Sequence, residues 1–187
     1  MTAGTGVSAE RAADRGRLRA ATAGGLCGLV AGACWIGKGA AVLVTGWQPP
    51  VLFEVAPLLM AMAVWGLARQ LPPSRGRTLG SAAGALGVAA ALPVVVGEVT
   101  SVPTAVTGTG MAVAHLAVLA GLTRVGVELR RQRGDVLPLV LAVVTVPAVA
   151  AGGALSALAG ERALEVPIVA LGFCWAVLGV RLLRQTS

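Results

Sequence analysis

Residues 139–144 read Leu139-Val140-Leu141-Ala142-Val143-Val144, six consecutive apolar side chains within a longer apolar segment. A strand of a membrane barrel requires apolar and polar side chains to alternate, and this stretch does not alternate. An α-helix satisfies its backbone hydrogen bonds internally, and about 20 apolar residues are enough for a helix to cross a bilayer. The stretch therefore predicts a membrane-spanning helix.

Six apolar segments of this kind occur along the chain, at residues 20–46, 51–70, 79–98, 104–124, 136–158 and 166–184. Hydrophobic residues make up 56% of the chain and charged residues 12%, whereas a soluble domain has roughly 25% charged residues. We predict an all-α, polytopic integral membrane protein built as a bundle of six transmembrane helices. A flexible tail is expected over residues 1–19, and a short C-terminal end over residues 185–187.

The arginines predict the orientation of this bundle. Removing the single lysine, Lys38, from the 15 lysines and arginines leaves 14 arginines, and all but Arg162 lie in the tail, the second loop, the fourth loop or the C-terminal segment. Because basic loops stay on the cytoplasmic side of a membrane, both termini are predicted to be cytoplasmic. The localisation expected is the inner (cytoplasmic) cell membrane, and the preference for arginine with abundant alanine, glycine and valine favours a bacterial source.

The net charge of +7 does not predict a nucleic-acid partner. The arginines lie between the apolar segments and form no stripe with interleaved aromatic residues. A second alternative concerns the first segment, where Ala33-Cys34 resembles a signal-peptide cleavage site. The apolar run continues to Val44, longer than a signal peptide requires, so we expect the segment to be retained as a span.

Charged and polar residues inside the spans are the candidates for a functional site. A charged residue in hydrocarbon costs roughly 2.5–3.5 kcal/mol on insertion scales, so it persists when it is paired, reaches the headgroups or has a function. Four residues fall in the predicted outer half or near the middle of the bundle: Lys38, Glu54, Glu98 and His115. They form a hypothetical intramembrane polar cluster. The alternatives are that Lys38 extends to the outer headgroups or forms a purely structural pair with Glu54.

Glycines at four-residue spacing predict close helix packing, because the absence of a side chain lets two backbones approach. Gly24, Gly28 and Gly32 lie on one face of the first span, and Gly80 and Gly84 recur in the third. The lipid bilayer is the expected partner of the outer surface. These glycine faces also suggest a homo-oligomer or another membrane protein as partner.

No catalytic motif or cofactor fingerprint appears in the sequence, and no cluster of residues has the ligand spacing of a metal site. Cys27, Cys34 and Cys174 are not arranged as a redox pair and are expected to be packing residues. The sequence thus favours a structural or accessory membrane subunit over a small transporter or channel-like protein that uses the polar cluster. A membrane-embedded enzyme is the least favoured class.

Overall fold

The computed structural model describes residues 4–49, 51–100 and 104–185, except for the side chains of residues 4–14, 98–99, 104–106 and 161. Over these ranges the chain is all-helical. The elements are α1 (Gly4–Thr45), α2 (Leu52–Arg69), α3 (Arg75–Thr100), α4 (Thr104–Arg133), α5 (Leu137–Ala159), the short 3₁₀ helix η1 (Glu161–Leu164) and α6 (Glu165–Arg184). Each of the six α-helices contains a segment long and apolar enough to cross a membrane.

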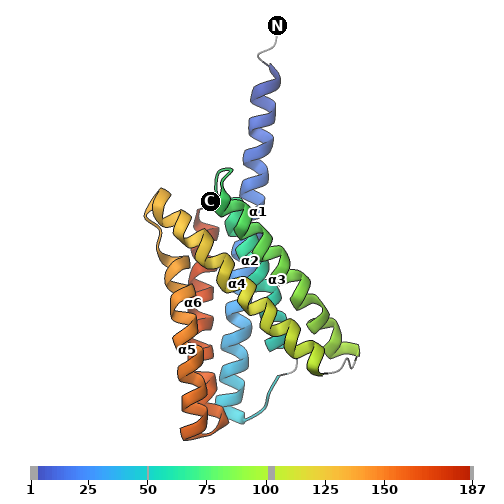
Figure 1. Ribbon diagram of the computed structural model, residues 1–187, viewed down its shortest axis with the longest axis vertical. Helices are drawn as coiled ribbons and strands as arrows, with labels where there is room; N and C mark the ends of the chain where they lie inside the picture. Colours follow the sequence, from blue (N-terminus) through green and yellow to red (C-terminus); the bar gives the residue numbers. More distant parts are fainter. Residues whose placement is uncertain (1–3, 50, 101–103, 186–187) are drawn as a thin grey trace.

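Two helices extend well beyond their predicted apolar segments. α1 is helical from Gly4, whereas the composition predicts a flexible tail over residues 1–19, and it projects beyond the rest of the bundle (Figure 1). Alanine and arginine are strong helix formers and are frequent in residues 4–19, so the helix extends before the apolar run. α4 continues to Arg133 and carries arginines in its last turn, where positive charge complements the helix dipole.

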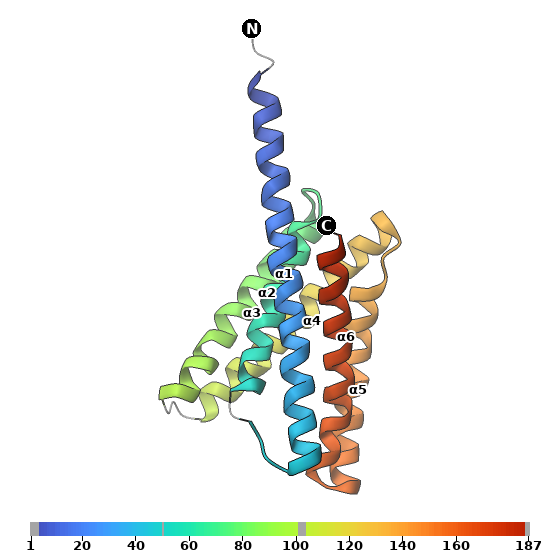
Figure 2. The ribbon, with the colours of Figure 1, turned by 180° about the vertical axis from the view of Figure 1, so that it is seen from behind.

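The six helices place both chain ends at one end of the bundle. Figures 1 and 2 show the C-terminus at the same end as the projecting part of α1, together with the α2–α3 and α4–α5 connections. We call this the arginine-rich end, because it carries the ends of helices that bear Arg69, Arg75, Arg133 and Arg184. The α1–α2 connection and the η1 turn lie at the opposite end.

α2 is the most deeply buried of the six helices, and α5 is the least. α1 packs extensively against both α2 and α6, α2 also contacts α3 and α4, and α5 contacts α4 and α6. The α3–α4 pair leans away from α5 and α6 toward the opposite end of the bundle (Figures 1 and 2). The helices therefore pack most closely toward the arginine-rich end and diverge toward the other.

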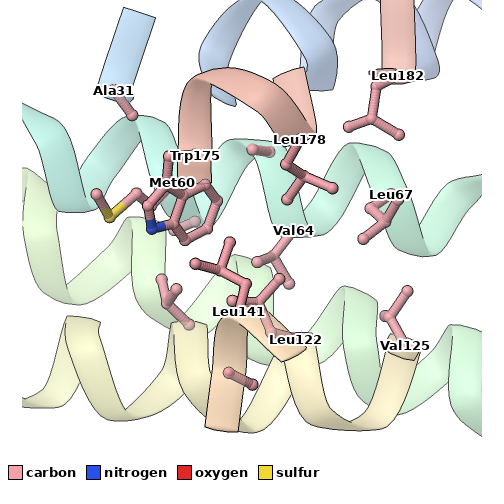
Figure 3. Packing of buried hydrophobic residues seen from close by; sticks show 14 of the residues in the cluster. Ala31, Met60, Val64, Leu67, Leu122, Val125, Leu141, Trp175, Leu178 and Leu182 are labelled. Carbon is pink, nitrogen blue, oxygen red and sulfur yellow. The ribbon is translucent and has the colours of Figure 1, made fainter. Parts of the chain in front are cut away.

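The apolar core fills the closely packed region. Its largest fully buried side chains include Trp175, Met60 and Leu122, and Figure 3 shows them with branched aliphatic residues from the neighbouring helices. Leu178 and Leu182 continue the core along α6 toward the arginine-rich end. The buried charged side chains of Lys38 and Glu165 lie outside this core, toward the opposite end of the bundle.

Glycines permit the closest helix contacts. A Cβ atom added to Gly24 would lie 3.0 Å from the Cα of Gly66 on α2, and one added to Gly28 would lie 3.4 Å from the Cα of Gly179 on α6. A Cβ on Gly32 would collide with the carbonyl oxygen of Gly172 on α6. On α3, Gly80 faces Val125 and Ala68, and Gly84 faces Trp65. All five predicted packing glycines thus lie at helix contacts within the bundle.

Candidate functional site

A buried ion pair joins the first and last helices. Lys38 lies two turns before the end of α1, and its ammonium group donates a hydrogen bond to Oε1 of Glu165, the first residue of α6. The two residues are only 7% and 2% exposed, so the pair is shielded from its surroundings. Lys38 therefore does not reach out of the bundle toward headgroups.

Glu165 is a site residue that sequence reasoning missed. The sequence suggested a pair with Glu54 only as one alternative for Lys38, and the last span was expected to begin only at residue 166. The sequence did contain an indication that Glu165 could reach Lys38. Because successive spans run in opposite directions, the sixth span of six begins at the end of the bundle where the first span finishes. Pro167 also predicts the first turn of a helix, which places Glu165 at its start.

The aromatic ring of Phe53 completes the surroundings of the lysine. The Nζ atom of Lys38 lies 5.0 Å from the centroid of this ring, within the range of a cation–π interaction. The ammonium group thus interacts with a carboxylate from α6 and an aromatic face from α2. These contacts offset part of the cost of removing its charge from water.

Glu54 faces the same cavity as the ion pair. The cavity has a volume of about 530 Å³ and is lined by Lys38, Gln48, Pro49, Phe53, Glu54, Ser156, Leu164, Glu165 and Ile168. We call it the polar cavity. Lys38 and Glu54 are thereby brought together as the sequence suggested, although Glu165, and not Glu54, forms the ion pair.

The polar cavity has an excess of hydrogen-bond acceptors. Oε2 of Glu54 and Oε2 of Glu165 are both buried and lack a hydrogen-bond partner among the described residues. Both carboxylates lie in the first turn of a helix, where the helix dipole favours negative charge. With all three groups ionised, one positive and two negative charges give the cavity lining a net charge of −1. This arrangement suits a ligand that is positively charged and donates hydrogen bonds.

His115 lies beside the polar cavity and does not line it. Its ring stacks on Trp35 with 6.1 Å between centroids and an interplanar angle of 21°. Its Nδ1 atom donates to the carbonyl oxygen of Met111 at 2.8 Å, which satisfies one side of the ring within α4. The histidine is therefore held in place by local contacts, as an interior residue.

Trp35 and His115 line a second cavity of about 510 Å³, which we call the apolar cavity. Its lining comes from α1, α2, α4, α5, η1 and α6 and is mostly aliphatic. Phe53, Leu164 and Ile168 line both cavities, so the two cavities are neighbours. The divergence of α3 and α4 from α5 and α6 opens the space between Gly108 on α4 and Val149 on α5.

The remaining predicted residues contribute no described side chain to the polar cavity. Glu98 is on the last turns of α3, and its side chain lies outside the described residues. Cys27, Cys34 and Cys174 carry free thiols, as packing residues do. Among the side chains that the structure describes, no group of three histidine, cysteine or acidic residues has the geometry to hold a metal ion.

In comparisons with known proteins, no family model, curated sequence or solved structure matches this chain.

Proposed function

We propose that the protein is a multi-pass membrane protein that binds a small cationic solute in the polar cavity, as a small transporter or channel-like protein would. The observation that carries the proposal is that two buried carboxylate oxygens without partners, on Glu54 and Glu165, line one cavity with Lys38. Buried polar groups are normally hydrogen-bonded, and an unpaired acceptor costs about 1–3 kcal/mol. A bound ammonium or metal cation would remove that cost.

The membrane placement rests on six apolar helices and on the distribution of arginine. All arginines except Arg162 lie toward the arginine-rich end: on the part of α1 before residue 20, in the last turn of α2, the first turn of α3, the last three turns of α4 or the last turn of α6. We place this end in the cytoplasm by the positive-inside rule. The polar cavity then lies toward the external side of the cell membrane, where it receives solutes from outside.

A structural or accessory subunit, which the sequence alone favours, has less support from the geometry. Such a subunit would use its glycine faces to bind another copy or another membrane protein. Gly24, Gly28 and Gly32 instead contact α2 and α6 of the same chain. The closest packing surfaces of α1 are therefore already covered inside the bundle.

Binding of methylammonium to the purified protein tests the solute proposal. We expect methylammonium chloride to raise the melting temperature in neutral detergent, because a ligand that binds only the folded state stabilises it. N-methylglucamine chloride keeps the ionic strength constant. The same titration with Na⁺ shows whether a metal cation satisfies the site equally well.

Glu54→Gln is the informative variant, because it removes a cavity charge without stranding Lys38, whose partner is Glu165. It should abolish the methylammonium shift. Glu128→Gln is the matched control: Glu128 lies on α4 near the arginine-rich end and hydrogen-bonds Gln132. No shift with either cation in the native protein, or equal losses in both variants, would refute the solute proposal.

Orientation is tested by single cysteines in a variant from which Cys27, Cys34 and Cys174 have been removed. A cysteine at position 76 or 132 should resist a membrane-impermeant maleimide in intact cells, whereas one at position 48 should react. The reverse labelling pattern would show that the arginine-rich end faces outward.

A further inference from the structure

Three arginines surround a cavity at the arginine-rich end, far from the polar cavity along the helices. This cavity has a volume of about 390 Å³ and is lined by Gly16, Arg17, Ala20, Trp65, Arg69 and Arg77. The arginines come from three different helices, α1, α2 and α3. We call it the arginine cavity.

The arginines that line the arginine cavity, Arg17, Arg69 and Arg77, form no ion pair with a carboxylate whose side chain the structure describes. The lining also contains no acidic residue. The lining of the cavity therefore carries three positive charges and no negative charge.

Two of the guanidinium groups are held in defined positions. The guanidinium carbon of Arg69 lies 4.8 Å from the ring centroid of Trp65, one turn earlier on α2. Nη1 of Arg77 donates to the carbonyl oxygen of Leu71 at 3.5 Å, which ties α3 to the α2–α3 connection. Both groups keep further N–H donors for a ligand, because a guanidinium group has five.

We propose that the arginine cavity binds the phosphate group of an anionic phospholipid headgroup. Guanidinium groups match phosphate oxygens with paired hydrogen bonds, and basic cavities between membrane helices recognise anionic lipid headgroups. Trp65 supports a lipid over a soluble phosphate, because tryptophan favours the boundary between headgroups and hydrocarbon. The inference relies on the membrane placement proposed above but not on solute binding in the polar cavity.

Lipid retention by the full-length protein tests this inference. The protein, purified in a neutral detergent, is incubated with equal amounts of phosphatidylglycerol and phosphatidylcholine, and bound lipid is counted by native mass spectrometry. We expect phosphatidylglycerol to be retained preferentially. Soluble glycerol phosphate at the same concentration should not displace it; full displacement would overturn the assignment to a lipid.

The test variant is Arg17→Gln/Arg69→Gln/Arg77→Gln, and the control is Arg130→Gln/Arg131→Gln/Arg133→Gln. The control removes the same charge from exposed positions in the last turn of α4, at the same end of the bundle. The test variant should bind phosphatidylglycerol at least about tenfold more weakly than the control, as expected for losing one charge-assisted hydrogen bond.

Equal affinity in the two triple variants would show that diffuse attraction to positive charge explains lipid binding, and would overturn the proposal. If the test variant melts early, Arg69→Lys provides a milder variant. Lysine keeps the charge but not the planar paired donors, so the lipid preference should still fall. Glu54→Gln should retain phosphatidylglycerol normally, so that the lipid and solute proposals can fail separately.

Discussion

Lys38 and Glu165 form a buried ion pair although 127 residues separate them in the sequence. The pair connects α1 with α6, the two helices that also make the most extensive contact in the bundle. Its position at the edge of the polar cavity gives it two roles. It contributes to the packing of the first and last helices, and it fixes one of the two carboxylates that line the cavity.

Lys38→Met should reduce the free energy of unfolding by about 3–5 kcal/mol, because it leaves the Glu165 carboxylate buried without its partner. Stability is measured by denaturant unfolding in mixed micelles. Arg181→Met is the control, since Arg181 pairs with Asp135 at 3.2 Å but is 47% exposed. The Asp135 side chain is 11% exposed, but because the Arg181 guanidinium is open to solvent the pair should contribute only about 1 kcal/mol. Equal losses in the two variants would contradict a special role for the buried pair.

Replacing both members of the pair should restore much of the lost stability. A buried ion pair exchanged for well-packed apolar residues is often neutral or stabilising by about 1–4 kcal/mol, because neither charge then remains to be desolvated. Lys38→Met/Glu165→Met should therefore be more stable than Lys38→Met alone in the same unfolding assay. A double variant as unstable as the single one would mean that the cost arises from something other than the stranded carboxylate.

Gly32→Ala should destabilise the bundle, whereas Gly153→Ala should not. The new methyl group at Gly32 would collide with backbone atoms of Gly172 and Ala176, which cannot rotate away. Overpacking of this kind costs about 1–3 kcal/mol. Gly153 has no atom within 4 Å of its Cβ position, and alanine there should gain up to about 1 kcal/mol from helix propensity. The melting temperatures of the two variants in detergent measure these effects. A Gly32→Ala protein as stable as the native protein would show that α1 and α6 lie farther apart than in this structure.

His115→Ala should cost about 1–3 kcal/mol, the sum of a stacked aromatic pair and one hydrogen bond. His115→Phe retains a ring against Trp35 and loses only the bond to Met111, so its cost should be about 1.5 kcal/mol or less. The two variants are compared by thermal unfolding. If His115→Phe is the less stable of the two, the ring does not contribute through stacking on Trp35.

The sequence alone was sufficient to predict the helical class and the six apolar helices. The length of an apolar segment and the turn-forming residues between segments are local properties of the sequence. The segment 51–70, for example, corresponds to α2 within two residues at its start. The early start of α1 was missed because its tail is polar, and polarity indicates only that a segment does not insert. It does not show whether the segment is helical.

The site could be predicted only in part. Lys38 and Glu54 were identified because charges in apolar runs are conspicuous, and both line the polar cavity. Glu165 was missed because the order of helices around the bundle determines which carboxylate reaches Lys38, and hydropathy contains no information about that order. The grouping of His115 with Lys38 failed for the same reason, since depth along a helix does not specify the direction in which a side chain points.

Contact between α1 and α6 has a consequence for the assembly of the chain during synthesis. Lys38 is synthesised with the first helix, whereas its partner Glu165, the first residue of α6, is synthesised only after the four helices α2–α5 have been made. Until then, Lys38 has no Glu165 to pair with, and the glycine face of α1 has no α6 to pack against. A chain that stops before residue 165 can never complete this closure, so quality control should recognise it as unfinished.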